Sequence, residues 1–265
     1  MKYILLCTTL ILSTWAIGQT AQREAPHSAS FELGKGLNLS FNDGDYIFSL
    51  GGMIQPAVGF SRDSSAEADY FLNSRRTYFN IGGKAKNEKV SFFIQTDFSL
   101  ASPLLDAWIS HQPHKSTTIT FGQQQTIANN REMMVMEDQL QFIDRSLLSN
   151  VYSSTGREFG LYVSSELALK SLVFVPQIAV TSGDGRNSFG VDSRDIDAGG
   201  LKYAARLDVY PLGLFTEGND KQIMDIAHEA KPRLILGAAA SYNDGASDVI
   251  GEGHNNLELY NLLGQ

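Results

Sequence analysis

The chain has 265 residues, a net charge of −8 and a mean hydropathy of −0.14. This moderate hydropathy is not typical of a helical membrane protein, and after residue 18 no run approaches the ~20 apolar residues that a spanning helix needs. The acidic balance argues against nucleic acid as a partner, because such a surface requires clustered positive charge.

The first 18 residues have the pattern of a secretory signal peptide. Lys2 supplies the positive start, residues 4–17 form an apolar core with small polar interruptions, and Gly18 is a small residue at the expected cleavage position. A short N-terminal membrane anchor is the alternative. The only cysteine, Cys7, lies inside this core, so the mature chain could form neither disulfides nor cysteine metal sites.

The next segments predict a flexible start followed by a hairpin. Residues 19–36 are small and polar, which is typical of a flexible N-terminus. Residues 37–41 alternate as a short strand, and the turn sequence NDGD at residues 42–45 favours a hairpin over a calcium loop, because the other ligands of such a loop are absent. Residues 46–60 then predict a long strand, with a local break or bulge at Pro56.

Four alternating segments follow between residues 71 and 123, joined by short polar turns. The clearest is residues 89–99, in which one set of alternate positions is apolar and the other is mostly polar. Successive side chains of a strand point to opposite faces, so each segment predicts a strand with one apolar face. The apolar set of the clearest segment is Val90, Phe92, Ile94, Thr96 and Phe98.

Residues 124–155 interrupt the alternation. A loop of this length in a compact protein is usually functional or disordered. Within it, residues 136–148 place apolar side chains at helical spacing, which predicts a short amphipathic helix. These apolar side chains are Met136, Leu140, Ile143 and Leu147.

Strands are predicted again after residue 156, separated by polar loops at 182–199 and 211–232. The final stretch, LELYNLLGQ at residues 257–265, does not resemble a strand. The count is nine strands, or ten with residues 37–41. The later strands are predicted from Gly156 onward and at residues 172–181, 201–210 and 234–242.

Two environments fit these strands: a transmembrane antiparallel β-barrel with lipid outside and water inside, or a soluble β-sandwich. The export signal, aromatic residues near the strand ends and charges in the middle of the polar faces favour the barrel. The alternative is a secreted or surface-attached β-rich binding or adhesin protein without channel activity. The charges on the polar faces include Arg76, Asp97, Asp106, Arg206 and Asp208.

No catalytic set is evident, and we expect neither an enzyme nor a cofactor or metal site. His111 and His114 lie at a predicted strand–turn junction without a third ligand in view, so a surface turn is favoured over a metal site. Asp192, Asp195 and Asp197 could bind calcium, but a solvated loop is the favoured interpretation.

Six segments between residues 50 and 208 resemble, in order and spacing, the phosphate-selective porin O and P family. They are SRRTYFNIGGKA, LLDAWISHQP, ITFGQQ, FIDRSL, TGREFGLYVS and SGDGRN. The resemblance implies an all-β, sixteen-stranded barrel in the cell outer membrane, assembled as a homotrimer and narrowed by an inward-folded loop at residues 124–155. It also implies a porin for passive diffusion of small anions, with phosphate or polyphosphate among the candidates.

The resemblance also implies which residues line the pore or bind anions. Arg76 and Arg75 match the paired basic residues of the family, and strand alternation sends Arg76 into the lumen and Arg75 outward. Arg131 lies where the family folds its constriction loop. The remaining matches are Lys84, Asp106, Arg145 and Arg157, and alternation adds Lys89, Lys202 and Arg206 as lumen residues.

For each arginine, anion contact competes with a salt bridge across the lumen. The acidic lumen positions Asp97, Asp106, Glu158 and Asp208 give the lumen both signs of charge, which argues against a preference for phosphate more than against a pore. A sixteen-stranded barrel needs about six more strands of about ten residues each. We therefore expect residues 37–265 to be a barrel domain incomplete at its C-terminus, with a complete ten-stranded barrel as the alternative.

Overall fold

The structure is a computed structural model that describes residues 27–62, 68–85, 88–152, 156–186, 200–246 and 257–262. The predicted signal peptide at residues 1–18 lies outside these described residues. So do the three aspartates of the 182–199 loop, Asp192, Asp195 and Asp197.

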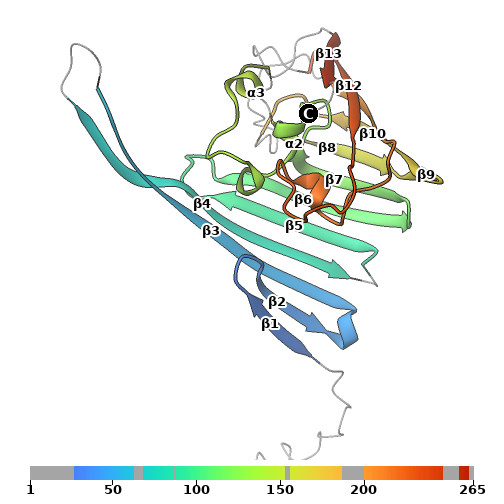
Figure 1. Cartoon of the computed structure of the whole chain (residues 1–265), viewed down its shortest axis with the longest axis horizontal. Helices are drawn as coiled ribbons and strands as arrows, with labels where there is room; N and C mark the ends of the chain where they lie inside the picture. Colours follow the sequence, from blue (N-terminus) through green and yellow to red (C-terminus); the bar gives the residue numbers. More distant parts are fainter. Residues whose placement is uncertain are drawn as a thin grey trace, which may run out of the picture.

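All thirteen strands of the described residues belong to one antiparallel sheet, in which neighbours follow the chain order from β1 to β13 and β9 pairs only with β10. Figure 1 shows the sheet as a curved wall, with the short helix α2 on its concave side. The sheet is open between β1 and β13. The strands are β1 Ser28–Glu32, β2 Gly36–Phe41, β3 Tyr46–Ser61, β4 Asp69–Ala85, β5 Val90–Asp97, β6 Leu104–His114, β7 Thr117–Gln125, β8 Arg157–Ser165, β9 Leu167–Leu169, β10 Leu172–Thr181, β11 Lys202–Tyr210, β12 Leu236–Asn243 and β13 Leu257–Leu262.

A continuous apolar row crosses the convex face. Each member is the direct register partner of the next, and most are exposed, for example Ile109 at 53% and Phe121 at 52%. Cross-strand pairs of this kind stabilise a sheet, and so large an exposed apolar face is typical of a surface that contacts a partner or a membrane. The row from β3 to β12 is Phe48, Gly83, Phe92, Ile109, Phe121, Leu161, Val180, Tyr203 and Tyr242.

The concave face is polar at the same height. The neighbouring row of register partners lies on this face and contains small and polar residues around one aromatic pair. Elsewhere on the concave face and in this row, the buried side chains include Gln95, Asp106 and Lys202. The predicted alternation is therefore confirmed along this row, while bulges interrupt it at Arg75 on β4 and at Leu105 on β6. This row is Ser49, Gly82, Phe93, Trp108, Gly122, Gly160, Thr181, Lys202 and Asn243.

The break expected at Pro56 is confirmed, but the extra residue lies on the partner strand. Gln55 pairs with Arg76 and Pro56 pairs with Ser74, so Arg75 has no partner in the ladder. Proline cannot donate a ladder hydrogen bond, which is compatible with a bulge at this point. The turn at residues 42–45 is also confirmed: it joins β2 to β3 through a 3-10 turn, η1 (Asn42–Gly44), in which Asp43 has a φ of 58°.

Three strands were missed. Residues 28–32, placed in the flexible N-terminus, form β1 against β2, and residues 257–262, considered unlike a strand, form β13 against β12. The third, β9, is only three residues long. In β1 the only large apolar residue is Phe31, and the other alternating position holds the small Ala29, so the pattern is weak and the strand forms by pairing with β2.

The amphipathic helix expected over residues 136–148 is wrong. The segment contains a 3-10 turn, η2 (Glu137–Gln139), flanked by α2 (Arg131–Met134) and α3 (Leu147–Tyr152), while Leu140 is extended. Arg145 donates hydrogen bonds to the carbonyl oxygens of Glu132 and Val135. A side chain, rather than the backbone N–H groups of a helix, therefore satisfies these two carbonyl groups. Within the part of the chain that the structure describes, no helix has the length and apolar character to cross a membrane.

Candidate functional site

Two loops from opposite ends of the sheet meet over the concave face. The β7–β8 loop (residues 126–156) and the β11–β12 loop (residues 211–235) connect strands at alternate ends, because consecutive strands run antiparallel. Arg131 Nη2 of the first donates to the carbonyl oxygen of Gln222 of the second at 2.9 Å. The β11–β12 loop also contains a 3-10 turn, η3 (Asn219–Lys221). The two loops together narrow the space above the sheet.

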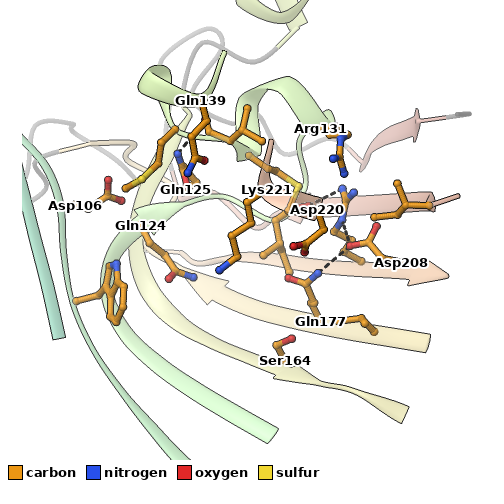
Figure 2. A pocket seen from close by; sticks show the side chains of 18 of the residues that line it. Asp106, Gln124, Gln125, Arg131, Gln139, Ser164, Gln177, Asp208, Asp220 and Lys221 are labelled. Atoms are coloured by element: carbon orange, nitrogen blue, oxygen red, sulfur yellow. Dashed lines mark hydrogen bonds and ion pairs between the residues drawn. The ribbon is translucent and has the colours of Figure 1, made fainter. Parts of the chain in front are cut away.

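A cavity of about 490 Å³ lies between these loops and the strands. Figure 2 shows Lys221 extending into it near Gln124, with Arg131 and Asp220 on the loop side. Four glutamines share its lining with acidic, basic and apolar groups, so the cavity has no single chemical character. The glutamines are Gln124, Gln125, Gln139 and Gln177.

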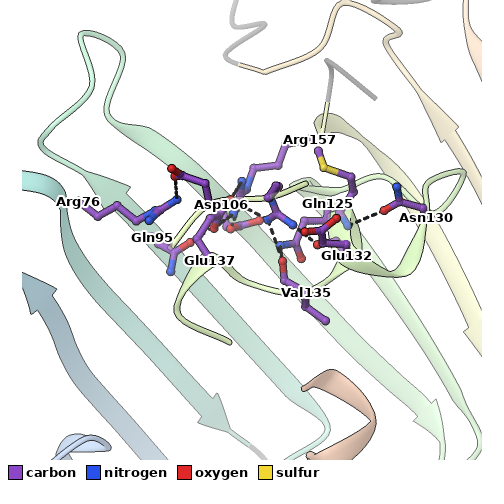
Figure 3. Close-up of polar contacts among 12 residues, drawn as sticks. Arg76, Gln95, Asp106, Gln125, Asn130, Glu132, Val135, Glu137 and Arg157 are labelled. Atoms are coloured by element: carbon purple, nitrogen blue, oxygen red, sulfur yellow. Dashed lines mark hydrogen bonds and ion pairs between the residues drawn. The ribbon is translucent and has the colours of Figure 1, made fainter. Parts of the chain in front are cut away.

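Arg157 is the centre of a buried charge cluster that holds the β7–β8 loop (Figure 3). Its Nε lies 3.1 Å from Asp106 Oδ2 on β6. Its Nη1 and Nη2 lie 3.1 and 3.2 Å from the two carboxylate oxygens of Glu137 in the loop. Nη2 also contacts Gln95 Oε1 at 3.4 Å. The guanidinium therefore bridges two strands of the wall to the loop with several charge-assisted hydrogen bonds.

Arg145 extends the cluster within the loop. It lies 2.9 Å from Glu137 Oε1, and its other hydrogen bonds go to backbone carbonyls. Glu132 accepts hydrogen bonds from the backbone N–H of Ser146 at 2.7 Å and from the hydroxyls of Ser146 and Ser149. These contacts tie α2 to the start of α3, which gives the loop a defined shape although its helical segments are short.

The pKa of Glu137 lies well below its ordinary value of 4.5. Burial alone would raise it, but the charges of and hydrogen bonds from Arg157 and Arg145 outweigh burial. A carboxyl with a lowered pKa in the folded state stabilises the fold above its unfolded pKa, and this contribution is lost as the pH falls towards the folded value. Glu137 therefore keeps the loop anchored at neutral and mildly acidic pH.

Arg76 and Arg75 both bind the loop. Arg76 donates to Gln55 Oε1 at 2.7 Å and to the carbonyl of Ile143 at 2.5 Å, and lies 3.3 Å from Asp144. Arg75 lies 2.7 Å from the same Asp144 carboxylate. The expectation that Arg75 points outward is wrong, because the bulge at Arg75 shifts the alternation there.

Two further basic side chains are neutralised by neighbours on the wall. Arg206 Nε lies 2.7 Å from Asp208 on the same strand, and its Nη1 donates to the carbonyl of Asn129 at 3.0 Å. Lys202 lies 3.0 Å from Glu158, which also accepts a hydrogen bond from the Thr181 hydroxyl. Arg206 and Lys202 thus form salt bridges, which was the alternative to anion contact, and so do Arg145 and Arg157.

The remaining predicted residues are dispersed. Lys84 forms an exposed ion pair with Glu88 at 2.9 Å, and Lys89 is exposed beside it at the β4–β5 turn. Of the predicted basic residues, Arg131 is the one that lines the cavity and forms no ion pair within the described ranges. Lys221, which sequence reasoning missed, joins it there. The unusual length of the polar stretch at 211–232 was the only signal available.

Gly237 leaves room for the Arg206–Asp208 pair. A Cβ at this position would lie 2.4 Å from Asp208 Oδ1 and 2.7 Å from Arg206 Nη2. We expect Gly237→Ala to displace this buried pair and to lower the free energy of unfolding by about 1–3 kcal/mol. Urea unfolding of the refolded protein in detergent measures this. Gly51→Ala is the control, because its Cβ would meet its nearest neighbour at 4.0 Å; equal losses in both variants would contradict this packing.

His111 and His114 lie on β6 and its turn. His111 Nδ1 lies 3.2 Å from the Lys89 carbonyl and His114 Nδ1 lies 3.0 Å from the Ser116 hydroxyl. Within the described ranges, no group of three or more potential metal ligands occurs.

The chain matches no model of a known protein family, and no curated protein is similar to it. The porin resemblance therefore stays a prediction.

Proposed function

We propose that this sheet is the wall of an outer-membrane porin through which small solutes diffuse passively. The observation that carries the proposal is the apolar row on the convex face, from Phe48 to Tyr242. A soluble protein rarely exposes so large an apolar surface, and an antiparallel sheet with one apolar and one polar face is the pattern of a barrel between lipid and water.

The open edges of the sheet are part of the same proposal. In lipid, unpaired backbone groups at the edges of β1 and β13 would cost several kcal/mol each. The edges must therefore find strand partners, either each other or strands of a further polypeptide. Assembly of the resulting barrels as a homotrimer belongs to the porin proposal as well.

Selectivity follows from the charges that remain unpaired. Arg145, Arg157, Lys202 and Arg206 are bound to carboxylates, which removes most of their attraction for passing anions. Arg131 and Lys221 line the cavity together with Asp220. We therefore propose a weak preference for small anions, phosphate among them, rather than a tight phosphate site.

Reconstitution of the full chain tests the proposal. We expect the protein to resist extraction from vesicles by urea or carbonate, to migrate faster on a gel when unheated, and to carry stepwise currents in a planar bilayer. A potassium chloride gradient should give a reversal potential slightly towards that of chloride. A secreted binding protein would be extracted and carry no current, and that outcome would reject the pore.

A further inference from the structure

An aromatic pair stands in the polar concave wall. Phe93 on β5 and Trp108 on β6 are register partners, and their ring centroids lie 5.9 Å apart at an interplanar angle of 37°. Both rings line the cavity beneath the loops and also a second cavity of about 500 Å³ on the same face. The pair thus lies between two cavities, where apolar ring surface borders polar space.

Glycines flank the pair in the same row. Gly82 is the partner of Phe93 on β4, and Gly122 is the partner of Trp108 on β7. A Cβ at Gly122 would lie 2.6 Å from Trp108 Cα, and Gly122 has a φ of 132°, which favours glycine. On both sides, therefore, the wall carries no side chain that could cover the rings.

Uncharged hydrogen-bonding groups lie around the rings in both cavities, and the first cavity also contains charged groups, among them Arg131, Asp220 and Lys221. The second cavity contains Asn38, Ser49 and Asn80, and the buried Oδ1 of Asn80 has no hydrogen-bond partner. Its two lysines, Lys35 and Lys84, each lie 2.9 Å from a glutamate carboxylate. In the first cavity, Gln124 and Ser164 provide amide and hydroxyl groups on the sheet side (Figure 2).

This combination fits a solute that has an apolar face and a rim of groups that both donate and accept hydrogen bonds. A simple inorganic anion has no apolar face, whereas a pyranose ring offers C–H faces between hydroxyl groups. We propose that Phe93 and Trp108 form a stacking site for a neutral saccharide. The proposal rests on the proposed function, since it needs the concave face to be filled with water.

Trp108 itself can report binding. The chain has two tryptophans, and the other, Trp15, lies in the predicted signal peptide. In full-length Trp15→Phe protein refolded in detergent, we expect maltotriose to change the tryptophan fluorescence in a saturable manner, while polyethylene glycol of similar mass and inorganic phosphate do not. Phe93→Ala should weaken the apparent affinity about tenfold, because it removes half of the stacking surface.

Phe142→Ala is the matched control, because Phe142 is 74% exposed in the β7–β8 loop and lines neither cavity. Absence of a maltotriose-specific change, or an equal response in Phe93→Ala, would overturn the saccharide site. The readout needs no current, so the site can fail while the protein still conducts in a bilayer. Conversely, a saturable response from a protein without conductance would support the site and reject the pore.

Discussion

Replacing Arg157 with methionine is expected to release the β7–β8 loop and to lower the free energy of unfolding by roughly 3–5 kcal/mol. Arg157 is 6% exposed and compensates two carboxylates, those of Asp106 and Glu137. Without the guanidinium, Asp106 is left in the wall as a buried charge without a cation. Glu137 keeps only Arg145, which belongs to the loop itself, so the main anchor between loop and wall is lost.

Two measurements follow the loop and the fold separately. Urea unfolding in detergent gives the stability, and single-channel conductance should rise several-fold if the released loop no longer narrows the pore. Lys84→Met is the control, because its ion pair with Glu88 is exposed and worth at most about 1 kcal/mol. Unchanged conductance together with a loss of stability would show that the loop does not restrict flow.

A rescue experiment identifies the unpaired Asp106 carboxylate as the cause. Asp106→Asn in the Arg157→Met background removes this charge while keeping a similar shape, and Glu137 keeps its ion pair with Arg145. A buried neutral amide costs much less free energy than a buried carboxylate without a cation, so we expect recovery of more than half of the lost stability. No recovery would assign the loss to packing around the Arg157 side chain instead.

Replacing Ile178 with arginine is expected to prevent stable membrane assembly, whereas Gln177→Arg on the same strand should be tolerated. Ile178 is 59% exposed on the convex face, near the middle of β10. An arginine near the bilayer midplane of a barrel costs about 2–4 kcal/mol. Gln177 faces the opposite side, where its amide lies 3.1 Å from Asp208, so an arginine there meets a carboxylate.

The folded fraction of each variant in lipid vesicles, read from the mobility difference between heated and unheated samples, tests this prediction. The two changes introduce the same charge at adjacent positions that face opposite sides of the sheet. If both variants assemble equally well, the convex face is not in lipid. If both fail, the concave position, whose register partner is Arg206, does not accept a second arginine, and the contrast between the two faces is contradicted.

The strands were predictable because alternation is a local property of the sequence. The strand at residues 90–97 was predicted correctly from its alternating pattern, which can be recognised without knowing which segment pairs with it. The helix over 136–148 failed for the opposite reason. Its apolar spacing was real, but Ile143 and Leu147 are exposed, so a helix with these residues on one face would have had nothing to pack against.

The candidate site was predictable in type but not in pairing. Alternation placed Arg76 and Arg206 on the polar face and the family resemblance supplied Arg157; all three lie there, but their partners come from distant segments or from the same strand. Glu137 is twenty residues from Arg157, and Asp144 is sixty-eight from Arg76. One bulged residue also reversed the expected direction of Arg75, and no local pattern marks which strand receives the extra residue.

The most direct test of the central claim is the environment of two adjacent positions in the reconstituted protein. Ile178→Cys and Gln177→Cys, each in a Cys7→Ser background, would be labelled with a bimane fluorophore in vesicles. We predict quenching by brominated lipid but not by aqueous iodide at position 178, and the reverse at position 177. Quenching by iodide at both positions would contradict the account, because the apolar face would then lie in water.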